Sequence, residues 1–384
     1  MADLATSSAP WLRIEVSSLA LRANLGEFRR LVQPPARLLA VVKADGYGHG
    51  LLLAARAFAA GGADWLGVHT VAEAACLRAA GITQPILVLG PANAAEAVQA
   101  ADLHCDLTVG SLPALQAVAA AGAGRVHLKV ETGVNRQGIV ERELEPALDL
   151  LAGAAGVKLV GVSSHFADIE DTTDHAFARR QQARFDAWLA RLETCGYNDL
   201  IRHMTCSAAA LLWTDSHRDL VRVGVSAYGI WPSRETRVAA RQVGREDLLL
   251  RPALTWKTTV SQVRAVPAGE TVGYGRTWLA SVASRVAVLP LGYSDGYPRA
   301  LSGRAHVLIR GRRAPLCGRI CMNLCMADVT NIPGAAAGDE AVLLGRQGDD
   351  RITVEQMADW LGTISYEVLT LPKAAWQRIE TADA

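Results

Sequence analysis

The sequence lacks long hydrophobic runs and lacks an excess of charge of either sign. No uninterrupted apolar stretch approaches the roughly 20 residues that a membrane helix needs, and residues 1–10 contain no basic region followed by an apolar run. We therefore expect a cytoplasmic protein without a membrane segment. With 39 basic and 38 acidic residues, the charge balance predicts no nucleic-acid or acidic-membrane partner and fits a small neutral or zwitterionic substrate better.

Cysteine is too scarce and too scattered for a secreted disulfide framework. The seven cysteines are an odd number spread over 384 residues, which favours a reducing compartment. Cys317, Cys321 and Cys325 recur every fourth residue, a spacing that a metal or iron–sulfur site could use. The surrounding residues 316–329 are typical of strands, however, and no histidine cluster accompanies them. We therefore interpret these three as core cysteines and expect no metal.

Short apolar runs alternate with Ala- and Leu-rich stretches of helical period between residue 38 and about residue 230. This pattern is typical of βα units and a parallel sheet. Eight such runs predict a (β/α)8 barrel rather than a doubly wound sheet, which usually needs fewer strands. The runs are 38–42, 65–68, 86–89, 107–109, 126–130, 159–163, 203–206 and 221–225, and the main helical stretches are 51–60, 73–80, 94–101, 112–121 and 176–192.

After Arg245 the helical period nearly disappears, and β-branched runs are separated by Pro-Ala-Gly, Ser-Gly and Pro-Gly turns. We therefore predict an α/β protein with two domains, a TIM-like barrel over 1–243 and a mostly β domain over 244–384. The first residues are also candidates to pair with the β domain. The β runs are 254–266, 285–291, 305–309, 319–329 and 341–344, and one helix is predicted over 354–361.

Polar residues follow several barrel runs, and in such a barrel the chemistry lies at the C-terminal ends of the strands. Lys43 directly follows the first run, in a chain with only five lysines against 34 arginines. Partial burial lowers the pKa of an amine there, so that it can form a Schiff base. A lysine extending from a strand end to solvent is the ordinary alternative. The glycines of the following KADGYGHG segment, 43–50, have the wrong spacing for a dinucleotide fingerprint.

The segment 43–50 resembles the cofactor-lysine motif of the alanine racemases, and the resemblance covers nearly the whole chain. It continues in VHLKVETGVNRQG (126–138), SSHFA (163–167), RVGVSAYG (222–229), VGYGRTW (272–278), LGYSDGYPR (291–299), GRICMN (318–323) and ISYEVLT (364–370). The resemblance implies a pyridoxal 5'-phosphate enzyme in which Lys43 carries the cofactor as an internal aldimine.

The resemblance also implies the other cofactor contacts. Those of the phosphate are the side chains of Tyr47, Ser207 and Tyr366 and the backbone amides of Gly224 and Val225. Arg222 faces the pyridine nitrogen, and His165 contacts the neighbouring arginine. Because the pKa of arginine exceeds 12, Arg222 cannot give that nitrogen a full proton, and a weaker electron sink suits racemisation. From the residues alone, each of these side chains also has an ordinary interpretation. Ser207 could be the N-cap of a helix over 207–213, His165 could be a histidine of the core, and Arg222 could be an arginine in a salt bridge at the rim of the barrel.

Racemisation removes a proton from one face of Cα and returns one to the other, so two acid–base groups on opposite sides are the natural arrangement. The resemblance implies that Lys43 serves one face and Tyr274 the other. In the family this tyrosine comes from the partner subunit, which implies a head-to-tail homodimer. From the residues alone, a tyrosine in a glycine-rich turn is often only a packing residue.

Substrate contacts follow from the same resemblance. Arg136 and the backbone of Met322 bind the substrate carboxylate, and Lys129 matches a lysine that is often carbamylated to position that arginine. Tyr293 narrows the entrance. Asn323 departs from the pattern, which usually carries aspartate there, and so removes a charge near the carboxylate site.

The sequence thus predicts an isomerase that interconverts L-alanine and D-alanine by two-base proton transfer at Cα of an external aldimine, supplying D-alanine for cell-wall synthesis. Two alternatives stay open at this point. One is a racemase for other amino acids such as serine, lysine or arginine. The other is a pyridoxal-phosphate decarboxylase, which shares the barrel and β-domain plan but needs a different carboxylate environment. A non-catalytic cofactor-binding protein would ordinarily end after the barrel.

Overall fold

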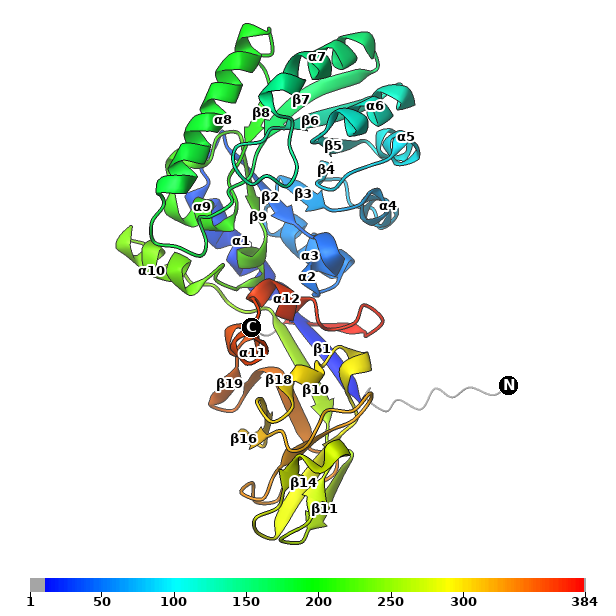
Figure 1. The fold of residues 1–384 in the computed structure, drawn as a ribbon, viewed down its shortest axis with the longest axis vertical. Helices are drawn as coiled ribbons and strands as arrows, with labels where there is room; N and C mark the ends of the chain where they lie inside the picture. Colours follow the sequence, from blue (N-terminus) through cyan, green and yellow to red (C-terminus); the bar gives the residue numbers. More distant parts are fainter. Residues whose placement is uncertain (1–10, 383–384) are drawn as a thin grey trace, which may run out of the picture. The chain divides into compact units, whose positions relative to one another are not determined.

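The computed structural model describes residues 11–382, which form two compact units (Figure 1). One unit is Ser18–Arg251. The other combines the N-terminal strand β1 (Leu12–Ser17) with the chain from Pro252 onward.

Eight parallel strands form the sheet of the first unit, in the order β8-β7-β6-β5-β4-β3-β2-β9. The edge strands meet through two backbone bonds, from the Asp219 amide to the Arg202 carbonyl (3.1 Å) and from the Arg222 amide to the Thr205 carbonyl (3.2 Å). The prediction of an eight-stranded barrel is therefore confirmed. The strands are β2 (Arg37–Val41), β3 (Trp65–Val68), β4 (Ile86–Val88), β5 (Cys105–Val109), β6 (Gly124–Lys129), β7 (Val157–Ser163), β8 (Ile201–His203) and β9 (Leu220–Val223).

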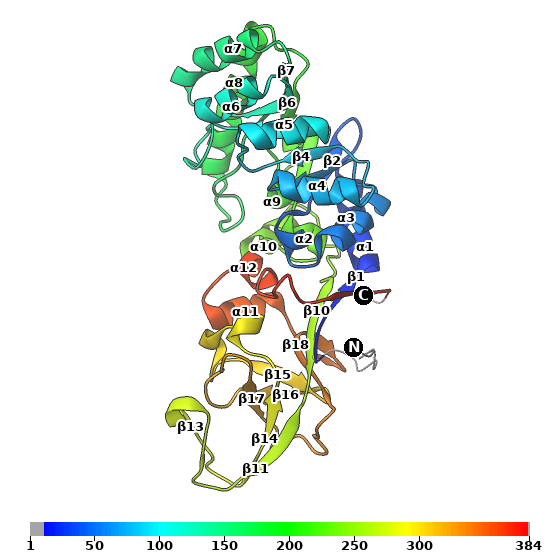
Figure 2. The same ribbon diagram turned by 90° about the vertical axis from the view of Figure 1, so that its right-hand side faces the viewer.

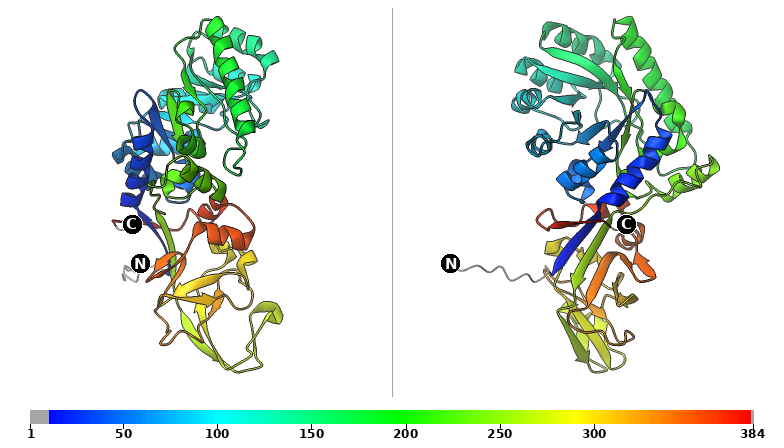
Figure 3. Two further views of the ribbon diagram at one scale, coloured as in Figure 1. Left: turned by 90° about the vertical axis from the view of Figure 1, so that its left-hand side faces the viewer. Right: turned by 180° about the vertical axis from the view of Figure 1, so that it is seen from behind.

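Helices cover the outside of this sheet. Figure 2 shows α4, α5, α6 and α7 side by side along it, and the view from behind in Figure 3 shows α1 and α8 outside as well. Capping boxes begin two of them, with Thr70 and Glu73 at α4 and Asn93 and Glu96 at α5. The main helices are α1 (Ser18–Leu31), α3 (Leu51–Ala60), α4 (Val71–Ala79), α5 (Ala94–Asp102), α6 (Leu112–Ala121), α7 (Leu144–Gly153), α8 (Ala176–Thr194), α9 (Ser207–Leu212) and α10 (Arg234–Gln242).

The second unit is mostly β. Its larger sheet has the order β16-β15-β18-β10-β1-β20 with β19 on β18, and a smaller sheet has the order β11-β14-β17. Strand β1 runs antiparallel to β10 and parallel to β20, so both ends of the described chain lie in one sheet. The elements are β10 (Leu254–Thr259), β11 (Gln262–Val266), β12 (Thr271–Val272), β13 (Trp278–Leu279), β14 (Ser284–Leu289), β15 (His306–Ile309), β16 (Arg312–Pro315), β17 (Cys325–Asp328), β18 (Glu340–Gln347), β19 (Asp350–Ile352), β20 (Arg378–Thr381), α11 (Val354–Leu361) and α12 (Ser365–Leu369).

Two β runs differ from the sequence prediction. The run 254–266 divides into β10 and β11, and they belong to different sheets. In the run 319–329 only Cys325–Asp328 is a strand. The preceding residues form a loop because their carbonyls pair with another loop instead of a strand: the amides of Tyr293 and Ser294 donate to the carbonyls of Cys321 and Met322 (3.1 and 3.0 Å).

Residues 11–382 contain no helix with the length and apolar character needed to cross a bilayer. Within the same residues, no three His, Cys, Asp or Glu side chains are grouped so that they could hold a metal ion. The seven cysteines are free thiols, and Cys317 and Cys325 are buried.

Candidate active site

Lys43 lies at the C-terminal end of β2, where a tight turn replaces regular helix. Ala44, Asp45 and Gly46 all have positive φ angles of 53 to 62°. The Ala44 amide donates to Glu73 Oε1 (2.8 Å), and the Asp45 carboxylate accepts from the Leu51 amide (2.8 Å) at the start of α3. The turn that carries Lys43 is therefore tied to the two helices that follow β2 and β3.

The surroundings of Lys43 favour its neutral form. Burial lowers the pKa of the Lys43 amine, the positive charge of Arg136 lowers it further, and Glu73 only partly opposes them. A neutral amine has the lone pair that a nucleophile or a proton acceptor needs. The lowered pKa thus makes more of this neutral amine available at a given pH.

Tyr47, Ser207 and Gly224 converge at the barrel ends of β2, β8 and β9. A Cβ atom at position 224 would lie 2.7 Å from the Tyr47 hydroxyl, so glycine leaves the space that this hydroxyl needs. Ser207 Oγ accepts a hydrogen bond from the Gly224 amide (2.9 Å), and Val225 begins a 3-10 turn, Val225–Tyr228. Burial raises the pKa of Tyr47, which keeps its phenol as an O–H donor. Hydroxyl and backbone amide donors are groups that bind phosphate, so this end of the barrel has the donor types that a phosphate group requires.

Arg222 is buried and held by several acceptors. Its Nη2 atom donates to the carbonyls of Ser164 (2.8 Å) and Met204 (3.1 Å) and lies 3.4 Å from His165 Nδ1. Its Nη1 atom lies 2.6 Å from Nδ1 of His203. Burial lowers the pKa of Arg222 to about 10, so the guanidinium is still charged at neutral pH.

A cluster of positive groups surrounds the strand ends. Burial and the charges of Arg222 and Arg136 lower the pKa of Lys129 to about 8, and its Nζ donates to Gln137 Oε1 (3.4 Å). Burial, followed by the charges of Arg222 and Lys129, lowers the pKa of His165 well below its ordinary value, so that histidine is neutral. Arg136 is exposed. The cluster has the charge to attract a carboxylate.

The remaining expected residues belong to the β unit. Tyr274 is 71% exposed and begins the turn Tyr274–Arg276. The flanking glycines have φ angles of +76° and +73°, and a Cβ at Gly275 would lie 3.1 Å from the Arg319 guanidinium carbon. The turn therefore needs glycine both for its backbone and for contact with Arg319.

Met322 and Tyr293 are 56% and 42% exposed, and Tyr366 lies partly buried in α12. Asn323 joins the loop of Met322 to the loop of Tyr293. Its Nδ2 atom donates to Ser294 Oγ (2.6 Å) and lies 3.5 Å from Asp295 Oδ2. Ser294 Oγ in turn donates to the Met322 carbonyl (2.8 Å). An aspartate at position 323 could not donate to Ser294 and would place a second carboxylate next to Asp295, so the amide fits this chain.

Sequence reasoning missed three polar side chains inside the barrel, Asp106, His127 and His203. All three are at least 96% buried, and each lies within an apolar strand. The signal was present, because a histidine or aspartate inside a buried strand must find a partner. His203 contacts Arg222, His127 contacts His203, and Asp106 contacts His127.

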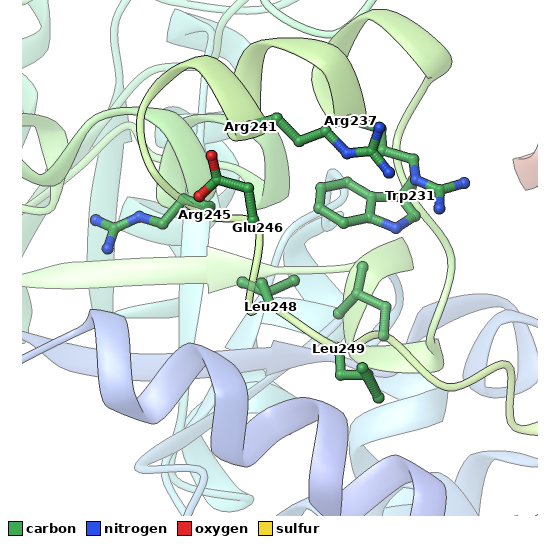
Figure 4. A pocket seen from close by; sticks show the side chains of 8 residues that line it. Trp231, Arg237, Arg241, Arg245, Glu246, Leu248 and Leu249 are labelled. Carbon is green, nitrogen blue, oxygen red and sulfur yellow. The ribbon is translucent and has the colours of Figure 1, made fainter.

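A separate cavity of about 220 Å³ lies in the barrel unit beside α10 (Figure 4). Figure 4 shows the side chains of Arg237 and Arg241 close to the Trp231 ring. None of the expected site residues lines this cavity.

Comparison with known proteins covers nearly the whole chain. Residues 16–232 match the family model of the alanine racemase N-terminal domain, and residues 253–380 match that of the C-terminal domain. The alanine racemase of Desulfovibrio desulfuricans is 40% identical over 366 residues, which is 94% of this chain and 95% of that protein. That of Leptospira interrogans is 36% identical over 362 residues, covering 93% and 92% of the two chains.

Solved structures agree with these matches. The alanine racemase of Streptomyces lavendulae superposes with a TM-score of 0.89 at 35% identity, covering 98% of this chain and 99% of the other. The alanine racemase of Bacillus anthracis with bound L-Ala-P gives a TM-score of 0.90 at 31% identity, covering 98% and 96%.

Proposed function

This chain belongs to the alanine racemase family, and from this premise we propose that Lys43 and Tyr274 move the protons by which it interconverts L-alanine and D-alanine. Membership confirms the resemblance drawn from the sequence motifs and the prediction of an isomerase. The observation that carries the proposal is the environment of Lys43, where burial and Arg136 favour a neutral amine on a fixed turn.

We propose pyridoxal 5'-phosphate as the cofactor. Its ring delocalises negative charge from Cα once the substrate amine is attached to it. The close approach of the Tyr47 hydroxyl to Gly224, together with Ser207, supports phosphate binding there, and Val225 and Tyr366 complete the proposed contacts. His165 and Arg222 would face the ring, and Arg222 keeps its proton because its pKa of about 10 lies above neutral pH.

Lys43 takes or returns the proton on one face of Cα, and Tyr274 acts on the other. Arg136 and the Met322 backbone hold the substrate carboxylate, which fixes Cα between the two groups. Because the amine of Lys129 has a pKa of about 8, a sizeable neutral fraction is available to react with CO2, giving a carbamate and a proton. A carbamate would supply Arg136 with an anionic partner.

We propose that Tyr274 reaches the active site of a partner subunit in a homodimer. The β unit supports this with a group of large apolar side chains that are exposed to solvent in the single chain, Tyr274 among them. The group consists of Tyr274, Leu279, Val282, Tyr293, Met322 and Leu324, each 42 to 71% exposed. The free thiols of all seven cysteines are consistent with a cytoplasmic enzyme.

Borohydride reduction of the cofactor-loaded enzyme, followed by peptide mapping, tests the assignment of Lys43. We expect the reduced cofactor on Lys43 and no label in the Lys43→Ala variant, with the exposed Lys158→Ala variant as a matched control that labels normally. Label on another lysine would overturn the proposal.

The same preparations test the reaction. In D2O, wild-type enzyme should exchange the Cα hydrogen of L-alanine while forming D-alanine, and Tyr274→Phe should lose most of this turnover. Faster turnover of serine, lysine or arginine would indicate the wider or different substrate range. Release of CO2 would indicate the decarboxylase.

A further inference from the structure

A continuous row of buried hydrogen bonds connects Arg222 with the barrel interior. Arg222 Nη1 lies 2.6 Å from His203 Nδ1, His203 Nε2 lies 2.8 Å from His127 Nδ1, and His127 Nε2 lies 3.1 Å from Asp106 Oδ2. The four residues are at most 8% exposed. Asp106 is also held by Arg125, whose Nε lies 2.8 Å from Oδ1 and whose side chain is half exposed.

Only one direction of donation satisfies this row with neutral imidazoles. Arginine has no acceptor, so His203 Nδ1 must accept and its proton must lie on Nε2. His203 Nε2–H then donates to His127 Nδ1, and His127 Nε2–H donates to the Asp106 carboxylate. Burial lowers the pKa of both histidines, which keeps them neutral. For Asp106 burial alone would raise the pKa, but the hydrogen bonds from His127 and Arg125 outweigh it, so the carboxylate stays ionised.

The neighbouring strand makes room for this row. A Cβ at Gly161 of β7 would lie 2.2 Å from His127 Nδ1, so only glycine fits beside the imidazole. The pairing of β6 with β7 shifts register between Val126 and His127, and the Trp65 ring packs edge-on against His127 at 6.0 Å. A histidine that needs both a glycine and a register shift in the adjacent strand is tightly constrained.

From this geometry we propose that His203, His127 and Asp106 are positioning residues for Arg222, forming a directional relay in which the Asp106 carboxylate fixes the tautomers of both histidines and thereby the guanidinium. The proposal rests on the proposed function at one point only, which is that Arg222 lies next to the cofactor ring. We name these three residues with Arg222 the relay.

The proposal predicts how a substitution at Asp106 alters the hydrogen bonds of His127, His203 and Arg222. Leucine at position 106 removes the acceptor for His127 Nε2–H, so His127 adopts the Nδ1–H tautomer to avoid an unpaired buried donor. That proton faces His203 Nε2–H, which moves the His203 proton to Nδ1, where it opposes the Arg222 donor. Arg222 must then shift, although its own partners Ser164 and Met204 are unchanged. Asparagine at position 106 keeps an acceptor oxygen and should preserve the tautomers.

The test is 15N NMR of the cofactor-loaded, histidine-labelled full-length enzyme, in which the nine histidines are assigned from His127→Gln and His203→Gln spectra. In the wild type we expect both relay imidazoles to carry the proton on Nε2 and to be bare at Nδ1. A protonated Nδ1 on either histidine overturns the proposal, whatever the variants do. This readout does not depend on turnover, so an inactive enzyme with the expected tautomers would refute the proposed function and leave the relay standing.

Kinetics separate positioning from mere stability. Asp106→Leu should lower kcat on the order of tenfold, as expected for a small misplacement of an active-site group, with little change in KM for alanine, and Asp106→Asn should restore most of the loss. Thr108→Val is the matched control, because Thr108 lies two residues along β5, is buried, and has no hydrogen-bond partner for its hydroxyl among residues 11–382. If Asp106→Leu lowers only the melting temperature and leaves kcat and the tautomers at wild-type values, the relay is only structural and the proposal is wrong.

Discussion

Replacing Gly224 with alanine should weaken cofactor binding by displacing one hydroxyl. The new Cβ would lie 2.7 Å from the Tyr47 oxygen and 3.3 Å from the adjacent ring carbon, and the first distance is shorter than side-chain carbons tolerate. The φ angle of Gly224 is −106°, so no left-handed penalty adds to this contact. Tyr47 is packed against Tyr228 with ring centroids 4.9 Å apart, which limits how far it can move aside.

The expected magnitude is that of one hydrogen bond to a charged group. Such a bond contributes about 1.5 to 3 kcal/mol, which corresponds to roughly 10- to 150-fold in the cofactor dissociation constant. Titration of the apoenzyme with pyridoxal phosphate, followed by absorbance, measures that constant. Turnover at saturating cofactor should fall much less, because Lys43 is not displaced.

A double-mutant cycle tests whether Gly224 acts through the Tyr47 hydroxyl. Tyr47→Phe removes the same hydroxyl without adding bulk at position 224, so each single variant should weaken binding and the double variant should be no weaker than the worse of the two. Additive losses would mean that Gly224 acts on something other than the Tyr47 hydroxyl. Unchanged binding in Gly224→Ala would refute the proposal that the Tyr47 hydroxyl beside Gly224 binds the cofactor phosphate.

Three further outcomes are expected from single changes. The lowered pKa of Lys129 means that between about pH 8 and 10.5 the unfolded chain binds more protons than the folded chain, so stability rises with pH through this window. Lys129→Met should flatten that rise and raise the melting temperature at pH 7 in CO2-free buffer, and an unchanged stability profile would contradict the burial of this amine. Leu279→Asp should weaken the proposed homodimer in sedimentation equilibrium and lower activity at low enzyme concentration, whereas Leu19→Asp, a matched exposed site on α1, tests whether any surface charge does so. A fully dimeric Leu279→Asp variant would locate the interface elsewhere. Asn323→Asp should lower the free energy of unfolding by about 1 kcal/mol in urea titrations, because the new carboxylate cannot donate to Ser294 and lies next to Asp295. A more stable variant would show that the Asn323 amide does not hold the two loops together.

The barrel was predictable because its signals are local. Each strand is a short apolar run that ends in a turn, and the runs 65–68 and 51–60 coincide with β3 (Trp65–Val68) and α3 (Leu51–Ala60). Lys43 could be singled out because a lysine directly after a buried strand points to the chemical end of a barrel. The run of positive φ angles after it, from Ala44 to Gly48, was not predicted, since it depends on contacts with α3 and Glu73.

Long-range pairing was not predictable in detail. Strand β1 (Leu12–Ser17) finds its partners more than 200 residues away, in β10 and β20, and no periodicity in its own six residues identifies them. The loop before β17 has strand-like residues, but its carbonyls are taken by the loop at 293–294. In both cases the deciding hydrogen bonds come from residues that are distant in sequence.

The relay is a further case in which local pattern and function disagree. The interior of such a barrel is ordinarily filled by branched apolar side chains, and apolar residues at positions 106, 127 and 203 would avoid the cost of burying polar groups. Replacing these three with apolar residues of similar volume would remove that cost, but it would leave the Nη1 atom of buried Arg222 unpaired, which is itself destabilising. Arg222 Nη1 would then lose its partner at 2.6 Å, while Nη2 would keep Ser164 and Met204. The guanidinium would then be held through one nitrogen instead of two, so we expect it to be less firmly fixed at the place that we propose for the cofactor ring.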